Sequence, residues 1–226
     1  MIVDGAFFAR LPLASRFILV RHGESEGNAA GVFQGRRDYA LSPRGRQQAE
    51  ALGRSLREHP GAATLCSPLS RARETAEIAA RTAGFAAPIV SDVLTELETG
   101  SFTGRSWHEL REGGTDEWRS FRTRSWEGVA GAEREADLYD RAVAAWETLR
   151  SAAEKQARED PGSRPCVVAV THGGFLQWLV KATFGARAWF PILPIENCCI
   201  YRLRTEPVGP EHAAVFWETM DKRIEA

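Results

Sequence analysis

Short apolar runs and helical repeats of apolar residues alternate along this chain. The apolar runs predict buried strands at 17–20, 63–66, 89–90, 166–170 and 198–203, with a further strand over 213–216. Apolar residues between the runs recur every three or four positions. This pattern predicts helices that begin at Ser42-Pro43 and Ser67-Pro68, and further helices over 138–155 and 175–184. Such alternation favours an α/β fold, a three-layer sandwich with a mostly parallel central sheet and helices on both faces.

Local residues mark where the first two helices begin and end. In each Ser-Pro pair a capping hydroxyl is followed by the residue favoured at the first helical position. Gly84 is placed to end the second helix as a left-handed cap. The chain is long enough for one domain over 1–226, in which the irregular segment 104–131 is predicted to be a lid or insert over the site.

Segment 104–131 is rich in aromatic and basic side chains, so two interpretations stay open. It could form a lid that recognises a sugar phosphate, a nucleotide or a phosphorylated acid. It could equally be a helical flap that packs its own tryptophans together. The side chains concerned are Trp107, His108, Trp118, Phe121, Trp126 and the arginines at 105, 111, 119, 122 and 124.

Composition excludes several classes of function. The net charge of −1 provides no basic field for nucleic acid or an anionic membrane. No stretch approaches the ~18 apolar residues of a membrane helix. The extension 1–15 lacks the basic start of a secretory signal and carries Asp4, so a cytoplasmic protein is expected. The four cysteines form no CxxC motif and are expected to be buried, reduced thiols.

The same chemistry follows two of the predicted strands. The strand that ends at Val20 leads into Arg21-His22-Gly23, and the strand that ends at Val170 leads into Thr171-His172-Gly173. If the two strands are parallel neighbours, both histidines meet at the carboxyl edge of the sheet, where α/β proteins bind ligands. An arginine fork beside a neutral imidazole suits a phosphate, which the imidazole can attack.

A third basic group is predicted at the same edge. Arg71 follows the strand 63–66 near a helix start, and both arginines and helix N-termini favour anions. A zinc site on His22 and His172 is the alternative, but no carboxylate or third histidine accompanies them at ligand spacing. We therefore expect catalysis without a metal or cofactor, on a small phosphorylated substrate.

Five ordered blocks carry a resemblance to a known family. FILVRHGESEGN, LSPRGRQQAEALG, CSPLSRARETAE, LTELETGSFTG and VVAVTHGGFL resemble, in order, the pattern of the histidine phosphatase superfamily, which includes phosphoglycerate mutases and small-molecule phosphatases. The resemblance implies a phosphohistidine mechanism with His22 as nucleophile. It further implies that Arg21, Arg71 and His172 bind the phosphoryl group.

The resemblance also implies roles for several less prominent residues. Glu96 matches the spacing of the family's general acid to the glycines that follow, with Glu98 as the rival. Asn28 and Gly173 match positions that contact phosphate, and Asn197 matches a looser late position. The short stretch between Gly104 and Cys166 favours a phosphomonoester hydrolase. A phosphoglycerate mutase or bisphosphatase, a non-catalytic phospho-ligand-binding regulator, and a homodimer are left open.

Overall fold

Strand β1 (Ser15–Arg21) lies inside the sheet because its residues are apolar on both faces. In the computed structural model, which describes residues 1–193 and 195–224, the strand order is β3-β2-β4-β1-β5-β6. The pairs β3-β2, β2-β4 and β4-β1 are parallel, whereas β5 and β6 run antiparallel to their neighbours. The predicted α/β fold with a mostly parallel sheet is confirmed.

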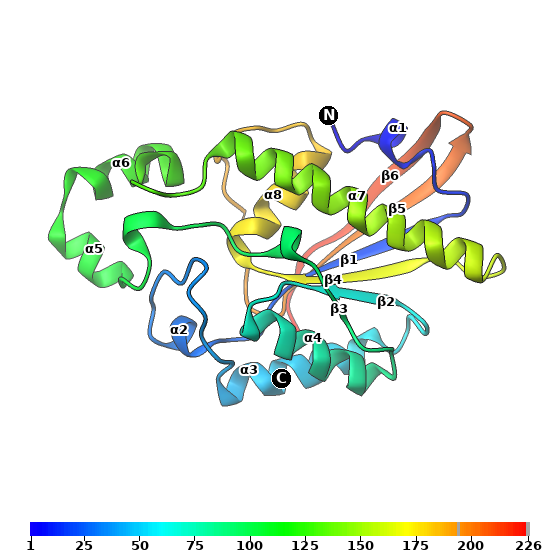
Figure 1. The fold of residues 1–226 in the computed structure, drawn as a ribbon, viewed down its shortest axis with the longest axis horizontal. Helices are drawn as coiled ribbons and strands as arrows, with labels where there is room; N and C mark the ends of the chain where they lie inside the picture. The colour runs from blue at the N-terminus through cyan, green and yellow to red at the C-terminus, as the bar shows by residue number, and fades with distance from the viewer. Residues whose placement is uncertain (194, 225–226) are drawn as a thin grey trace.

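Successive side chains of β1 point to opposite faces of the sheet, and the core is therefore divided into two layers. Phe17 and Leu19 pack in the cluster that contains α7 and α8, whereas Ile18 and Val20 pack in the cluster that contains α3 and α4. Figure 1 shows these two helix pairs on opposite faces of the sheet. Because side chains alternate between the faces of a strand, a continuous apolar run is what a strand covered on both sides requires.

The elements agree with the predicted pattern, with differences at their ends. The helices are α1 (Gly5–Phe8), α2 (Glu26–Ala29), α3 (Pro43–Leu56), α4 (Ser70–Ala83), α5 (Trp107–Gly113), α6 (Asp116–Arg124), α7 (Glu135–Glu159) and α8 (Gly173–Thr183). The strands after β1 are β2 (Ala63–Cys66), β3 (Ile89–Val90), β4 (Cys166–Thr171), β5 (Ile200–Gly209) and β6 (His212–Lys222). The described residues also form the 3₁₀ turns η1 (Asp92–Leu94), η2 (Gly100–Phe102) and η3 (Ser125–Gly128).

The prediction that a helix begins at Ser67-Pro68 is wrong. Helix α4 begins at Ser70, and its N-cap residue, Leu69, provides no side-chain hydrogen bond. The capping acceptor is Asp38, from a distant loop, which receives the Ser70 N–H at 2.9 Å. Ser42 does cap α3, where its hydroxyl accepts the Gly45 N–H, and Gly84 ends α4 in the left-handed conformation.

The segment 104–131 is more regular than the sequence indicated. It holds α5, α6 and η3, which lie at one end of the molecule in Figure 1. Backbone hydrogen bonds join it to the loop after α2, from Gly104 N–H to the Phe33 oxygen at 2.7 Å and from Phe33 N–H to the Arg105 oxygen at 2.9 Å. No helix among the described residues is long and apolar enough to cross a membrane.

Candidate active site

The two histidines predicted to converge do so. Strands β1 and β4 are parallel neighbours in the register Arg21 to Thr171. The His22 and His172 ring centroids are therefore 5.1 Å apart at the carboxyl edge of the sheet. A cavity of about 340 Å³ opens there, and its lining includes Arg21, His22 and Arg71.

His22 is held as a neutral base. Its Nδ1 lies 2.6 Å from the Gly23 carbonyl oxygen, which can only accept, so Nδ1 carries the proton and Nε2 keeps its lone pair. Burial, then the charges of Arg71 and Arg21, lower the pKa of His22 well below its ordinary 6.5. The imidazole is thus neutral near neutral pH, with its Nε2 lone pair available.

His172 is fully buried beside His22. Its Nε2 lies 2.7 Å from the Ser67 hydroxyl, and its Nδ1 has no hydrogen-bond partner among the described residues. Burial lowers the pKa of His172 well below 6.5, and the Arg71 charge adds to the effect. Ser67, which the sequence suggested as a helix cap, therefore orients this imidazole instead.

Arg21 and Arg71 are fixed by backbone carbonyls. Arg21 Nη1 donates to the Ile195 oxygen at 2.6 Å, and Arg71 donates to the oxygens of Gly35 at 2.8 Å and Arg37 at 3.0 Å. The Nε of each arginine is buried without a partner in the described part of the chain. Buried donors are rarely left unpaired in folded proteins, so these N–H groups indicate a site for an anion.

Asn28 and Asn197 are hydrogen-bonded to each other beside the cavity. Asn28 lines the cavity, and its Oδ1 accepts hydrogen bonds from the Ser25 N–H and from Asn197 Nδ2, both at 3.1 Å. Asn197 Nδ2 also donates to the His22 carbonyl oxygen at 3.0 Å. The geometry makes Asn197 a positioning residue for His22 and Asn28, outside the lining of this cavity.

Glu96 and Glu98 differ in what they face. Glu96 lines the cavity, and its Oε1 accepts the N–H groups of Leu97 and Phe175, both at 2.9 Å, while Oε2 accepts the Gly174 N–H at 3.2 Å. The Glu98 carboxylate instead accepts the Thr99 N–H and the Thr103 hydroxyl and does not line the cavity. The first turn of α8 thus aims the Glu96 carboxylate into the site.

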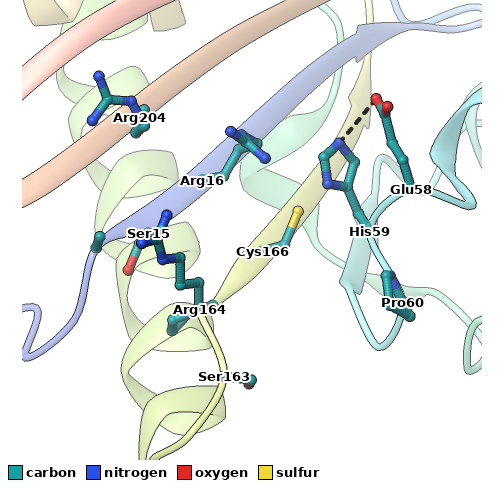
Figure 2. Close-up of a pocket in the computed structure, with 11 residues that line it drawn as sticks. Ser15, Arg16, Glu58, His59, Pro60, Ser163, Arg164, Cys166 and Arg204 are labelled. Atoms are coloured by element: carbon teal, nitrogen blue, oxygen red, sulfur yellow. Dashed lines mark ion pairs between the residues drawn. The ribbon is translucent and has the colours of Figure 1, made fainter.

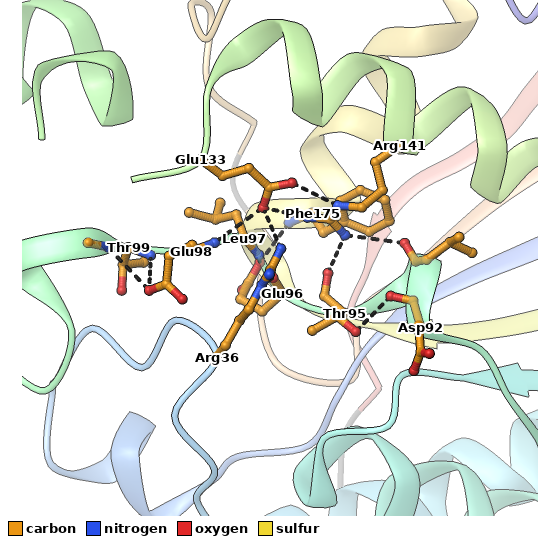
Figure 3. Close-up of polar contacts among 12 residues, drawn as sticks. Arg36, Asp92, Thr95, Glu96, Leu97, Glu98, Thr99, Glu133, Arg141 and Phe175 are labelled. Atoms are coloured by element: carbon orange, nitrogen blue, oxygen red, sulfur yellow. Dashed lines mark hydrogen bonds and ion pairs between the residues drawn. The ribbon is translucent and has the colours of Figure 1, made fainter. Parts of the chain in front are cut away.

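A network of charged side chains holds the chain on both sides of Glu96 (Figure 3). Arg36 donates to the Glu96 carbonyl oxygen at 3.2 Å, and Arg141 donates to the Thr95 carbonyl oxygen at 2.6 Å. The Glu133 carboxylate pairs with both guanidinium groups and also accepts the Glu98 N–H at 3.3 Å. We call Arg36, Glu133 and Arg141 the Glu96 clamp. The sequence analysis missed all three.

Aromatic rings form the other end of the cavity. Phe33, Trp107, Phe121 and Trp126 line it and touch one another, with centroid distances of 4.5 Å for Phe33–Trp107 and 4.9 Å for Phe121–Trp126. We call these four residues the aromatic wall. The aromatic residues of segment 104–131 pack on one another, as the flap interpretation requires, and three of them also line the cavity; recognition of a substrate by this segment stays a prediction. Its five arginines do not line the cavity.

The sequence analysis also missed lining residues outside segment 104–131. Phe33 is a lone aromatic residue in a polar, glycine-rich loop, and Trp189, Ile192, Leu193 and Ile195 lie in a Pro-containing run without helical or strand period. For the residues of this run, the sequence offered one sign of a role: an apolar stretch whose spacing fits neither a helix nor a strand.

A second cavity, of about 290 Å³, lies at the opposite edge of the sheet (Figure 2). Its arginines Arg16 and Arg204 both pair with Glu218, and His59 Nε2 lies 3.3 Å from Glu58 Oε1. Burial raises the pKa of the Cys166 thiol there to about 12, which leaves it unreactive. The first cavity is lined by Arg21, His22 and Arg71, with His172 packed against His22, and is therefore the candidate active site.

Two sequence comparisons identify the family to which the chain belongs. The family model described as histidine phosphatase superfamily (branch 1) matches residues 17–218. A probable phosphoglycerate mutase GpmB from Salmonella paratyphi C is 35% identical over 187 residues, which cover 82% of each chain.

Solved structures show the same fold. A mycobacterial glucosyl-3-phosphoglycerate phosphatase has a TM-score of 0.76 at 25% identity and matches 92% of this chain and 99% of its own. Bacillus stearothermophilus YhfR has a TM-score of 0.73 at 27% identity and matches 93% of this chain and 100% of its own.

Proposed function

Because the chain belongs to branch 1 of the histidine phosphatase superfamily, we propose that it is a metal-independent phosphomonoester hydrolase that acts through a phosphohistidine on His22. The observation that carries this proposal is the set of buried nitrogens without a partner on Arg21, Arg71 and His172 around a neutral His22. A phosphoryl group needs fixed positive charge and an aligned nucleophile, and this arrangement offers both.

The proposed reaction has two steps. In the first, His22 Nε2 attacks phosphorus, the ester P–O bond breaks, and protonated Glu96 gives its proton to the departing alcohol oxygen. In the second, Glu96 takes a proton from water, the water oxygen attacks phosphorus, and the P–N bond to His22 breaks to release phosphate. Arg21, Arg71, His172 and the amide of Asn28 hold the phosphoryl oxygens throughout, and Gly173 permits their close approach.

Trapping the covalent intermediate tests the nucleophile. We expect wild-type protein mixed with p-nitrophenyl phosphate to yield an acid-labile, alkali-stable phosphoenzyme, and His22→Ala to yield none. Turnover of His22→Ala should fall by several orders of magnitude, because the phosphoryl acceptor is removed. Near-normal turnover in this variant would contradict the proposal.

Chelation tests the metal independence. Since arginine donors neutralise the phosphoryl charge in the proposed mechanism, activity should survive exhaustive EDTA treatment. If EDTA abolished the activity and Zn²⁺ or Mg²⁺ restored it, the result would show that a metal ion neutralises the phosphoryl charge.

A mutase is the second candidate, supported by the similarity to the probable phosphoglycerate mutase GpmB. A mutase would interconvert phosphoglycerates, and 2,3-bisphosphoglycerate would stimulate it. Net phosphate release without such stimulation supports the hydrolase.

A further inference from the structure

The charged side chains of the active-site cavity gather at its phosphoryl end. Arg21, Arg71 and Glu96 lie close enough for their charges to affect one another. Among the described residues that line the cavity, these three are the charged ones when His22 is neutral. Beyond them the lining is aromatic, aliphatic or uncharged polar.

The cations that could have met a second charge on the substrate lie elsewhere. Arg119 is bound to Asp116 and to the Gly114 oxygen, and Arg141 is bound to Glu133. Arg122 and Arg124 do not line the cavity either. A substrate carboxylate placed against the aromatic wall would lose its hydration without gaining a cation, which is unfavourable.

The aromatic wall has an open face toward the cavity. Trp107 is 52% exposed although its ring centroid lies 4.5 Å from that of Phe33, whereas Trp126 is 8% exposed. Trp118 supports the wall from outside the cavity lining, with ring centroids 5.7 Å from Trp107 and 5.5 Å from Phe121. A supported, exposed indole at the rim of a cavity provides a flat apolar surface on which a ligand ring can pack.

From these observations we infer that the substrate is a phosphate monoester of an uncharged alcohol with an aromatic or similarly flat apolar group. This inference rests on the proposed phosphatase activity and adds the chemical class of the alcohol. It sets the chain apart from the printed activities of its relatives, since phosphoglycerate and glucosyl-3-phosphoglycerate each carry a carboxylate.

The test uses esters that differ in the alcohol alone. We expect kcat/KM for benzyl phosphate to exceed that for 4-carboxybenzyl phosphate and that for ethyl phosphate by at least tenfold. Trp107→Ala should reduce the preference for benzyl over ethyl phosphate about tenfold, as expected for a lost aromatic contact. Phe184→Ala, which truncates a 65% exposed ring outside the cavity, is the matched control and should leave the preference unchanged.

Adding a cation to the wall provides a gain-of-function arm. Trp107→Arg should raise kcat/KM for 4-carboxybenzyl phosphate relative to benzyl phosphate. Wild-type protein that hydrolyses the carboxylated ester, or 3-phosphoglycerate, as well as benzyl phosphate would overturn the inference.

A binding measurement distinguishes failure of this inference from failure of the proposed function. Calorimetric titration of the His22→Ala variant with benzyl and 4-carboxybenzyl phosphate measures the preference without turnover. If wild type hydrolyses no ester but His22→Ala prefers benzyl phosphate, the proposed hydrolase is wrong and the alcohol class stands. If wild type hydrolyses esters while neither measurement shows a preference for benzyl phosphate, the hydrolase stands and the alcohol class is wrong.

Discussion

The Glu133 carboxylate holds the Arg141 guanidinium by two hydrogen bonds, from Nε to Oε1 at 2.8 Å and from Nη2 to Oε2 at 2.9 Å. Arg141 also lies over the Phe175 ring, 3.9 Å from its centroid, and the Phe175 N–H is a donor to Glu96. The pair thus fixes both the chain that carries the proposed acid and the helix turn that aims it.

Loosening this clamp should impair proton delivery more than nucleophilic attack. We expect Glu133→Gln to slow an alkyl phosphate about tenfold and p-nitrophenyl phosphate much less, because p-nitrophenolate leaves without a proton. Steady-state kinetics with both esters measure the difference. Glu154→Gln is the control, since it removes the charge partner of Arg150 within α7, away from Glu96. Equal losses on both esters in Glu133→Gln would indicate a merely structural role.

Substitution of the two rival acids should separate their roles. Glu96→Gln should slow an alkyl phosphate by about 10²–10⁴, the usual worth of a general acid, and p-nitrophenyl phosphate far less. Glu98→Gln should show a small loss without dependence on the leaving group, because its carboxylate binds the Thr99 and Thr103 turn. The opposite result would identify Glu98 as the acid.

A methyl group on Gly174 should displace the proposed acid. A Cβ at this position would lie 2.3 Å from Leu97 Cδ2 and 2.7 Å from Glu96 Oε1, closer than such atoms pack. We expect Gly174→Ala to reduce turnover of alkyl phosphates about 10²-fold, as small misplacements of catalytic groups do. Gly173→Ala, whose Cβ would lie 3.3 Å from Arg21 Nε, should cost less, and a reversed order would contradict this account.

The nucleophile should remain active in mild acid. Because burial and the two arginines lower the pKa of His22, the free base persists as the pH falls through 6.5, and the acid limb of kcat/KM should lie below that value. The pH profile with p-nitrophenyl phosphate, corrected for ionisation of the substrate, checks this. Arg71→Gln removes a positive charge and should move the limb to higher pH, whereas a wild-type limb at or above 6.5 would contradict it.

The sequence predicted the parts of the site that depend on strand ends. Apolar runs ending at Val20 and Val170 imply two parallel strands, and parallel strands bring His22 and His172 to one edge. The start of α4 was beyond such reasoning, because Ser67 turns to His172 and the cap comes from Asp38 in a distant loop. The Glu96 clamp was missed for the same reason. Glu133 and Arg141 are eight residues apart, but Arg36 lies 97 residues before Glu133, and only the fold brings the three together around Glu96.

The aromatic wall belongs to different chain segments from the phosphoryl chemistry. His22, Arg71 and His172 follow strands of the sheet, whereas Trp107, Phe121 and Trp126 belong to an insertion joined to the loop at Phe33. Under the proposed function, substitutions in segment 104–131 should change which alcohol is accepted while the residues around the phosphoryl group keep their places. The two halves of the substrate would then be recognised by parts of the chain that can evolve separately.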